Sequence, residues 1–212
     1  MVCLYFMVMN SNDGSTDIND RLNSLESIIK FAVLNRCRDA IDTMLNDSTI
    51  VNNIEIKEIN INDIYTNFDY SKNVFAVYIK GIGDITLTLL LIIDVNDMKK
   101  LAEILIGNID SGNLEELAAS AIAEFGNILL AGAFTNALTN ITDFRIDCTA
   151  PGYANDTLAS IMEYIVADSS IYDFIYVKSE LSFVRNKDMI LTISMLIPVD
   201  DTKRLVEIAF RK

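Results

Sequence analysis

The sequence has no histidine among its 212 residues, and its three cysteines are far apart. The missing histidine excludes hydrolases that need a histidine base beside a serine or cysteine nucleophile, and it excludes every histidine-ligated metal site. Cys3, Cys37 and Cys148 form neither a CxxC pair nor a zinc-binding spacing. We therefore expect reduced and mostly buried thiols, as in a cytoplasmic protein, and no nucleophilic cysteine.

Basic clusters are also missing. The chain has 17 Lys and Arg against 30 Asp and Glu, which gives a formal net charge of −13, and no basic cluster exceeds a pair. Nucleic acids and anionic membranes bind basic surfaces, so neither is an expected partner. Four aspartates match no known metal-binding loop and are expected to form a solvated acidic surface: Asp143, Asp147, Asp156 and Asp168.

The N-terminal residues show no targeting or membrane-spanning signal. Residues 1–9 are apolar, but a membrane-spanning helix needs roughly 20 residues. They also lack the basic start and the cleavage site of a signal peptide. A polar connector follows at residues 10–16. We expect residues 1–18 to be a flexible segment, or the natural start to be Met7 or Met9, with no membrane insertion.

Apolar residues are plentiful enough for a sizeable core, because 51% of the chain is hydrophobic and the mean hydropathy is +0.29. We expect residues 1–212 to form a single domain. Helical periodicity predicts a helix over residues 19–45, a short helix capped by Asn96 and ended by Gly107, and a long helix from a cap at Asn113 to about Asn140. Two more helices are expected at residues 156–166 and after a cap at Asp200. Strands are predicted at residues 50–61, 74–79, 85–93, 144–149, 174–181 and 189–197.

Two parts of the sequence repeat at a constant offset. Leu87-Thr88 and Leu191-Thr192 begin matching runs 104 residues apart (191 − 87). The same offset relates further pairs: Ile93/Ile197, Val95/Val199, Asp97/Asp201, Lys99/Lys203, Leu101/Leu205, Glu103/Glu207 and Ile104/Ile208. The half-repeats span about residues 19–108 and 113–211. This duplication predicts an α+β fold with a pseudo-two-fold axis, in which a mainly antiparallel sheet is covered by two long helices.

The most informative segment lies on the second long helix. Ser120, Glu124 and Asn127 are spaced i, i+4, i+7 and share one helix face. An apolar face is expected to anchor the helix through Leu117, Ala121, Ile122, Phe125 and Leu129. A carboxylate and a carboxamide one turn apart then form a rigid polar probe that could enter another protein's active site. The first half carries Ile28 and Phe31 at roughly the same positions, so we expect a polar site in the second half only.

Together these features resemble the CheC/CheX/FliY family of chemotaxis phosphatases. The family motif is an Asp or Ser, then Glu, then Asn on one helix, followed by a downstream Pro, and here Ser120, Glu124, Asn127 and Pro151 fit it. The likeness to CheC covers roughly residues 20–210. One departure is that 23 residues (151 − 127 − 1) separate Asn127 from Pro151, one more than is usual in the family. An insertion near residues 129–132 would need a π-bulge or would rotate the rest of the helix.

The resemblance implies an enzyme that hydrolyses the aspartyl phosphate of a CheY-type response regulator. The regulator would bring the magnesium ion and a lysine, so the phosphatase needs no metal or cofactor of its own. Asn127 would orient the attacking water and Glu124 would pair with the regulator's lysine. Ser120 would contact the partner or brace Glu124, and Pro151 would fix a loop. A solvated or purely recognitional helix face remains the plainer interpretation of Glu124 and Asn127.

An alternative function is a non-catalytic docking module with the same fold. The family resemblance implies two partners of that kind, the receptor deamidase CheD and the flagellar switch. Asn127 discriminates between the two functions, because docking should tolerate its loss whereas water positioning should not. A third reading is a generic α+β domain that matches the motif by chance, which the constant repeat offset disfavours.

Overall fold

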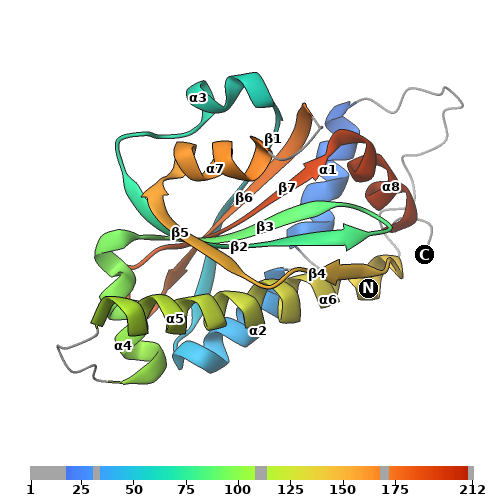
Figure 1. Ribbon diagram of the computed structural model, residues 1–212. Coiled ribbons are helices and arrows are strands. Elements are labelled where there is room, and N and C mark those ends of the chain that lie inside the picture. Colours follow the sequence, from blue (N-terminus) through green and yellow to red (C-terminus); the bar gives the residue numbers. More distant parts are fainter. Residues whose placement is uncertain (1–17, 31–33, 108–113, 168–171, 210–212) are drawn as a thin grey trace, which may run out of the picture.

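The computed structural model describes residues 18–30, 34–107, 114–167 and 172–209 (Figure 1). It is an α+β fold built on one seven-stranded sheet whose paired strands are all antiparallel. The strands are β1 (Thr49–Asn60), β2 (Asn73–Gly83), β3 (Leu87–Asp94), β4 (Ile146–Cys148), β5 (Gly152–Thr157), β6 (Asp173–Phe183) and β7 (Leu191–Pro198). Their order across the sheet is β1-β6-β7-β3-β2-β4, and β5 pairs with β2 beside β4.

The helices lie before, between and after the strands of each half. They are α1 (Ile18–Ile28), α2 (Leu34–Leu45), α3 (Ile64–Asn67), α4 (Met98–Ile106), α5 (Leu114–Asn127), α6 (Asn136–Thr142), α7 (Leu158–Ala167) and α8 (Val199–Ala209). Two 3₁₀ turns, η2 (Ile61–Asp63) and η3 (Val95–Asp97), lead into α3 and α4, and a π-helix, η4 (Ile128–Thr135), joins α5 to α6.

The pairing of β3 with β7 confirms the predicted pseudo-two-fold duplication. Thr88 pairs with Leu196, and Ile92 pairs with Thr192. At the repeat offset, Thr88 is equivalent to Thr192 (88 + 104) and Leu196 is equivalent to Ile92 (196 − 104). The duplication therefore converts the first pair into the second. Leu90 pairs with Ser194, which is its own equivalent in the other half (194 − 90 = 104). The pseudo-two-fold axis therefore passes through the centre of the sheet.

The outer strands are exchanged between the two halves. β1 belongs to the first half but pairs with β6 of the second half along its length, from Thr49↔Phe183 to Asn60↔Asp173. β4 and β5 belong to the second half but pair with β2 of the first half. Each half therefore completes the hairpin of the other, and the hydrogen bonds of the sheet link both halves.

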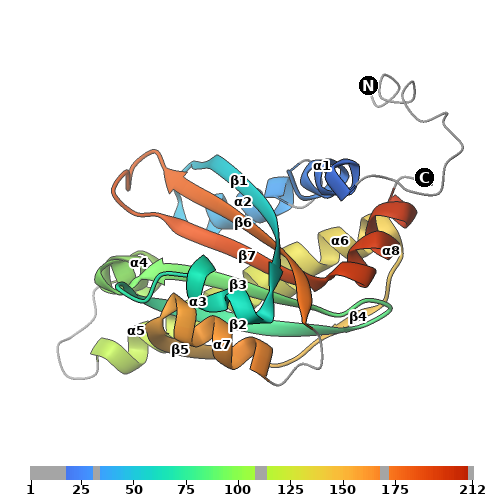
Figure 2. The same cartoon turned by 90° about the horizontal axis from the view of Figure 1, so that it is seen from above.

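The two faces of the sheet carry different cores. One face packs against α1, α2, α4, α5, η4, α6 and α8 through a large apolar cluster that includes Ile41, Phe75, Ile122 and Leu205. The other face is covered only in part, by α3 and α7, through a smaller cluster that includes Phe68. Figure 2 shows that the β6–β7 hairpin extends beyond α3 and α7. The two long helical stretches that the sequence predicts therefore cover one face together.

One helical stretch has the length and composition of a membrane span. Residues 115–142 form a continuous apolar helix of 28 residues. Its buried side chains, such as Ile122, Phe125 and Leu138, belong to the core cluster against the sheet. The hydrophobicity of this stretch is therefore that of a helix packed in the core of the fold.

Several predicted element boundaries differ from the structure. The helix predicted over residues 19–45 is described as α1 and α2, and residues 31–33 lie outside the described part. Asn96 is not the cap of the short helix, because the carboxylate of Asp94 accepts its backbone N–H at 3.0 Å. Asp200 is not a cap either, since it lies within the first turn of α8 and bonds Lys203 at 2.6 Å. Gly107 does end α4, with a φ of 83° that favours glycine.

Two elements were missed and two predictions are outside the described residues. β5 was not predicted, because the short stretch before α7 has no strong alternation, and α3 is only 4 residues long. The predicted N-terminal segment 1–18 lies almost entirely outside the described residues, and so does the predicted cap at Asn113.

Asp47 ties the turn between α2 and β1 to the β6–β7 hairpin. Its carboxylate accepts the backbone N–H groups of Ser48 at 2.7 Å, Arg185 at 2.9 Å and Asn186 at 3.1 Å. The side-chain amide of Asn186 adds a fourth bond at 2.9 Å. Burial of Asp47 works against ionisation, but the hydrogen bonds favour the carboxylate and hold its pKa below the usual value.

Candidate functional site

The predicted site helix, α5, rests directly on strand β2. A Cβ atom on Gly126 would lie 2.7 Å from Cγ1 of Val77, which is closer than real Cβ atoms approach. Gly126 therefore allows the helix backbone to touch the strand, because no side chain stands between them. Ile122 and Phe125 are buried on the same side of the helix. The glycine of the Glu-x-Gly-Asn segment thus fixes the height of the site above the sheet.

The polar residues of α5 point away from this contact. Ser120 and Glu124 are exposed and Asn127 is half-buried. Among the described residues, none of these three side chains has a hydrogen bond or an ion pair. Glu124 can accept hydrogen bonds, and Asn127 can both donate and accept them. The helix therefore presents two polar groups whose bonding capacity is unused.

A π-helix begins directly after the site. Residues 128–135 form η4, and the hydroxyl of Thr135 donates to the carbonyl oxygen of Leu130, five residues earlier, at 2.9 Å. A π-helix here is one of the two outcomes expected for an insertion near residues 129–132, and the segment from Ser120 to Asn127 stays α-helical. Residues 29 and 30 of the first half are also π-helical. The wider turn therefore occurs in both halves and is not tied to the longer Asn127–Pro151 spacing alone.

Two apolar side chains flank the polar pair on the solvent side. Leu117 was predicted on the anchoring face, but 47% of it is exposed, and Ile128 is 41% exposed. Leu117, Glu124 and Ile128 are spaced i, i+7, i+11 and so lie along one stripe of the helix. The prediction for Leu117 is wrong because this stripe faces away from the sheet. Ile122, Phe125 and Leu129 are buried, as predicted.

Pro151 lies at the entry to the strand beside α5. It is half-buried between β4 and β5, and β5 contacts α5. The next residue, Gly152, lies against Tyr78, where a Cβ atom would be 2.6 Å from the ring carbon Cζ. Pro151 and Gly152 thus start the edge strand where it runs beside the site helix.

Tyr153 is an exposed residue beside the candidate site that the sequence analysis did not identify. It pairs with Val77, the residue beneath Gly126, and 54% of it is exposed. Its ring stacks on buried Phe75 with the centroids 5.6 Å apart. The signal that could have found it is the aromatic residue two positions after Pro151, but β5 itself was not predicted.

The first half of the chain keeps no comparable polar pair in the described residues. Ile28, expected near the position of Glu124, is only 6% exposed and belongs to the main core cluster. Phe31, expected near the position of Asn127, lies outside the described residues. The equivalent helix face of the first half is thus used for packing at Ile28.

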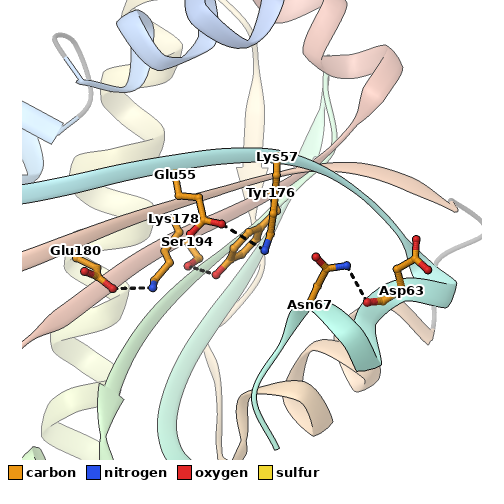
Figure 3. A network of polar contacts seen from close by, with 8 residues as sticks. All are labelled: Glu55, Lys57, Asp63, Asn67, Tyr176, Lys178, Glu180 and Ser194. Carbon is orange, nitrogen blue, oxygen red and sulfur yellow. Dashed lines mark hydrogen bonds and ion pairs between the residues drawn. The ribbon is translucent and has the colours of Figure 1, made fainter. Parts of the chain in front are cut away.

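A second group of polar side chains lies on the other face of the sheet (Figure 3). The hydroxyl groups of Tyr176 and Ser194 share a hydrogen bond of 3.0 Å at the centre of the sheet. Lys57 pairs with Glu55 at 3.3 Å, and its Nζ is 5.7 Å from the ring centroids of both Phe68 and Tyr176. Burial raises the pKa of Tyr176 to about 12, so this phenol stays protonated. Each lysine of the group is paired with a carboxylate, Lys57 with Glu55 and Lys178 with Glu180 at 2.6 Å, which indicates a structural role.

No group of three or more potential metal ligands occurs in the described part of the chain. Asp143, Asp147 and Asp156 are exposed, while Asp168 is outside the described residues. An open acidic pocket of about 490 Å³ lies at the start of α8, between Glu58 and Asp201, at the end of the sheet where β1 meets β6. It contains none of the predicted site residues.

Two of the three cysteines lie in the described part of the chain. Cys37 and Cys148 are both free thiols. Burial raises the pKa of Cys37 to about 12, so its thiol stays protonated at neutral pH. Cys148 is half-buried, and its Sγ lies 3.5 Å from the hydroxyl of Thr135 beneath the π-helix.

No model of a known protein family matches the sequence. Solved structures of flagellar and chemotaxis proteins nevertheless share the fold. FliY from Thermotoga maritima aligns with a TM-score of 0.71 at 15% identity, covering 93% of this chain and 100% of that chain. A chain of the CheX–CheY–BeF3–Mg complex from Borrelia burgdorferi aligns with a TM-score of 0.52 at 19% identity, covering 84% and 99%. The FliM middle domain from Vibrio alginolyticus aligns with a TM-score of 0.56 at 10% identity, covering 87% and 99%. The predicted resemblance to the CheC/CheX/FliY proteins is therefore confirmed at the level of the fold.

Proposed function

We propose that this protein is a chemotaxis phosphatase that hydrolyses the aspartyl phosphate of a CheY-type response regulator. The observation that carries the proposal is the pair Glu124 and Asn127, which project from a helix anchored on the sheet and have no partner among the described residues. The shared fold adds support, since the Borrelia burgdorferi CheX was crystallised in complex with CheY, BeF3 and Mg.

In this mechanism the protein supplies geometry and the regulator supplies the metal and the phosphoryl group. The transition state of phosphoryl transfer is loose, so placing one water in line with the scissile bond is most of the catalysis that remains available. The carboxamide of Asn127 would hold that water, because it accepts one hydrogen bond and donates others. The water oxygen bonds to phosphorus as the phosphorus–oxygen bond to the aspartate breaks. The products are inorganic phosphate and a free aspartate carboxylate.

Glu124 would set the position of Asn127 in the regulator's site. An exposed carboxylate one turn before the carboxamide can form a charge-assisted hydrogen bond with a lysine of the regulator. Ser120, another turn earlier, would contact the partner at the rim, and Pro151 would hold the start of β5 beside the helix. Water positioning of this kind is worth on the order of 2–4 kcal/mol, which corresponds to a rate increase of roughly 30- to 1000-fold.

The test is the decay of a magnesium-loaded, phosphorylated CheY-type receiver in the presence of the protein. Wild type should accelerate the decay, and Asn127→Ala should remove most of the acceleration while complex formation persists. Asn140→Ala is a matched control, because Asn140 is an exposed asparagine on α6 of the same helical stretch. An Asn127→Ala protein that is as active as wild type would refute the water-positioning role.

A docking module of the flagellar switch is the second candidate. The likeness to the FliM middle domain favours it, because that domain shares the fold over 87% of this chain. The family resemblance adds CheD as a possible partner. In this case wild type and Asn127→Ala would bind a switch protein or CheD equally well, and neither would change the decay of the phosphorylated receiver.

A further inference from the structure

Tyr153 is an exposed aromatic side chain held in one orientation. Its ring stacks on Phe75 at a centroid distance of 5.6 Å and an interplanar angle of 26°, while 54% of the residue remains exposed. Phe75 is 2% exposed and therefore fixed in the core. An aromatic ring already ordered by such a contact loses little conformational entropy when a partner covers it.

The strand register places this ring beside the site helix. Tyr153 pairs directly with Val77, and paired residues of an antiparallel ladder point to the same face of the sheet. The side chain of Val77 lies under Gly126 on that face. Since α5 and β5 are in contact, Tyr153 lies next to the turn of α5 that carries Glu124 and Asn127.

The surroundings of the polar pair are suited to contact with a protein. Leu117 of α5 and Ile128 at the start of η4 leave apolar surface exposed along the helix stripe that contains Glu124, and Tyr153 adds an aromatic ring from the neighbouring strand. Tyrosine is enriched among the residues that dominate binding at protein interfaces, and apolar contacts around a polar centre exclude water from it. Exclusion of bulk water is needed if Asn127 is to order a single water.

We infer that Tyr153 is a docking residue that contacts the receiver next to its phosphorylated aspartate. This inference rests on the proposed function. The partner surface it fits is an apolar patch of the receiver beside the acidic, magnesium-binding site. Tyr153 touches no reacting atom, so its loss affects formation of the complex and not the chemical step.

The test measures binding and turnover separately. Binding is measured to a CheY-type receiver loaded with Mg²⁺ and beryllium trifluoride, and turnover is measured with the phosphorylated receiver. Tyr153→Ala should weaken binding and raise KM by about 10- to 100-fold, while kcat at saturating receiver stays within about twofold of wild type. Tyr153→Phe keeps the stacked ring and should restore binding. Tyr153→Leu keeps an apolar cover over Phe75, so its weak binding would not reflect misfolding.

Tyr172→Ala is the matched control. Tyr172 is 64% exposed and precedes β6, beside β1 at the opposite edge of the sheet from β5. Its loss should leave both binding and turnover unchanged. Size-exclusion chromatography with light scattering should show the same oligomeric state for all variants.

Three results would overturn the inference while the proposed function still stands. Tyr153→Ala could bind the loaded receiver as tightly as wild type, or Tyr172→Ala could weaken binding equally. A change of oligomeric state with unchanged receiver binding would assign Tyr153 to a contact between copies of the chain. If wild type neither binds the receiver nor speeds decay, the proposed function itself fails, and the inference fails with it.

Discussion

Replacing Gly126 by alanine is expected to destabilise the protein, although alanine is the better helix former. The new Cβ would lie 2.7 Å from Cγ1 and 2.9 Å from Cβ of Val77, a buried and branched side chain with little freedom to move. Ordinary contact begins near 3.4 Å, so α5 and β2 would have to separate by about 0.7 Å (3.4 − 2.7).

The magnitude follows from two opposing effects. Overpacking of this kind costs about 1–3 kcal/mol. The better helix propensity of alanine returns about 1 kcal/mol, so Gly126→Ala should lower the free energy of unfolding by about 0–2 kcal/mol. Gly132→Ala isolates the propensity effect, because a Cβ on Gly132 meets nothing within 4 Å. That variant should be unchanged or more stable by up to about 1 kcal/mol.

Urea unfolding followed by circular dichroism measures these differences, and a double-mutant cycle with Val77→Ala identifies their cause. Val77→Ala removes the methyl groups that the new Cβ would meet, so Gly126→Ala should be less costly in that background. The shift of α5 should also reduce the proposed phosphatase activity, whereas Gly132→Ala should not. If Gly126→Ala proves as stable as Gly132→Ala, the helix is not held at the strand by this glycine and the reasoning is refuted.

Two further changes test other parts of the structure. Tyr176→Phe should lower the free energy of unfolding by about 1–2 kcal/mol, because it leaves the buried hydroxyl of Ser194 without its 3.0 Å partner; a neutral effect in urea unfolding would contradict this. Burial opposes ionisation of Asp47, but its hydrogen bonds hold the pKa of the folded state below the ordinary value of 3.8. The stability that the ionised carboxylate provides is therefore present above about pH 4, and it is lost as the pH falls through the folded pKa. Asp47→Asn should therefore be less stable than wild type at pH 7, and the gap should narrow in acid; a gap that is constant from pH 7 to below pH 3 would show that its ionisation is not involved.

The internal duplication could be predicted because many matching residues recur at one offset. Matches at one offset relate residues 87–104 to residues 191–208, and they imply equivalent hairpins and helices whatever the exact boundaries. The pairing of Leu90 with Ser194 then follows if the two copies meet at their edges. The exchange of β1 and β5 between halves could not be predicted, because it depends on contacts between residues more than 70 apart in the chain.

Two predicted helix caps were wrong and the edge strand β5 was missed, in both cases for local reasons. Asn96 and Asp200 are residue types that favour helix starts, but each lies one or two positions inside the structured turn, where Asp94 and Pro198 already mark the end of a strand. β5 is short, follows a proline and begins with a glycine, so its backbone is set by pairing with β2 and not by its own side chains.

The sequence predicts which residues of the candidate site share a helix face, but not which part of that face is exposed or what lies beside it. The i, i+4, i+7 spacing of Ser120, Glu124 and Asn127 places them together on any helix, and the structure has that helix. The sequence could not show which stripe faces solvent at Leu117, nor that Tyr153 stands beside the helix on another strand. The first depends on how α5 is rotated on the sheet, and the second depends on the pairing of β5 with β2.

The most direct test of the central claim is the decay rate of a phosphorylated CheY-type receiver with wild type, Asn127→Ala and Asn140→Ala. The account predicts that wild type and Asn140→Ala accelerate decay by roughly 30- to 1000-fold. It predicts that Asn127→Ala binds the receiver but leaves its decay close to the unassisted rate. Equal acceleration by all three proteins, or none by wild type despite binding, would contradict it.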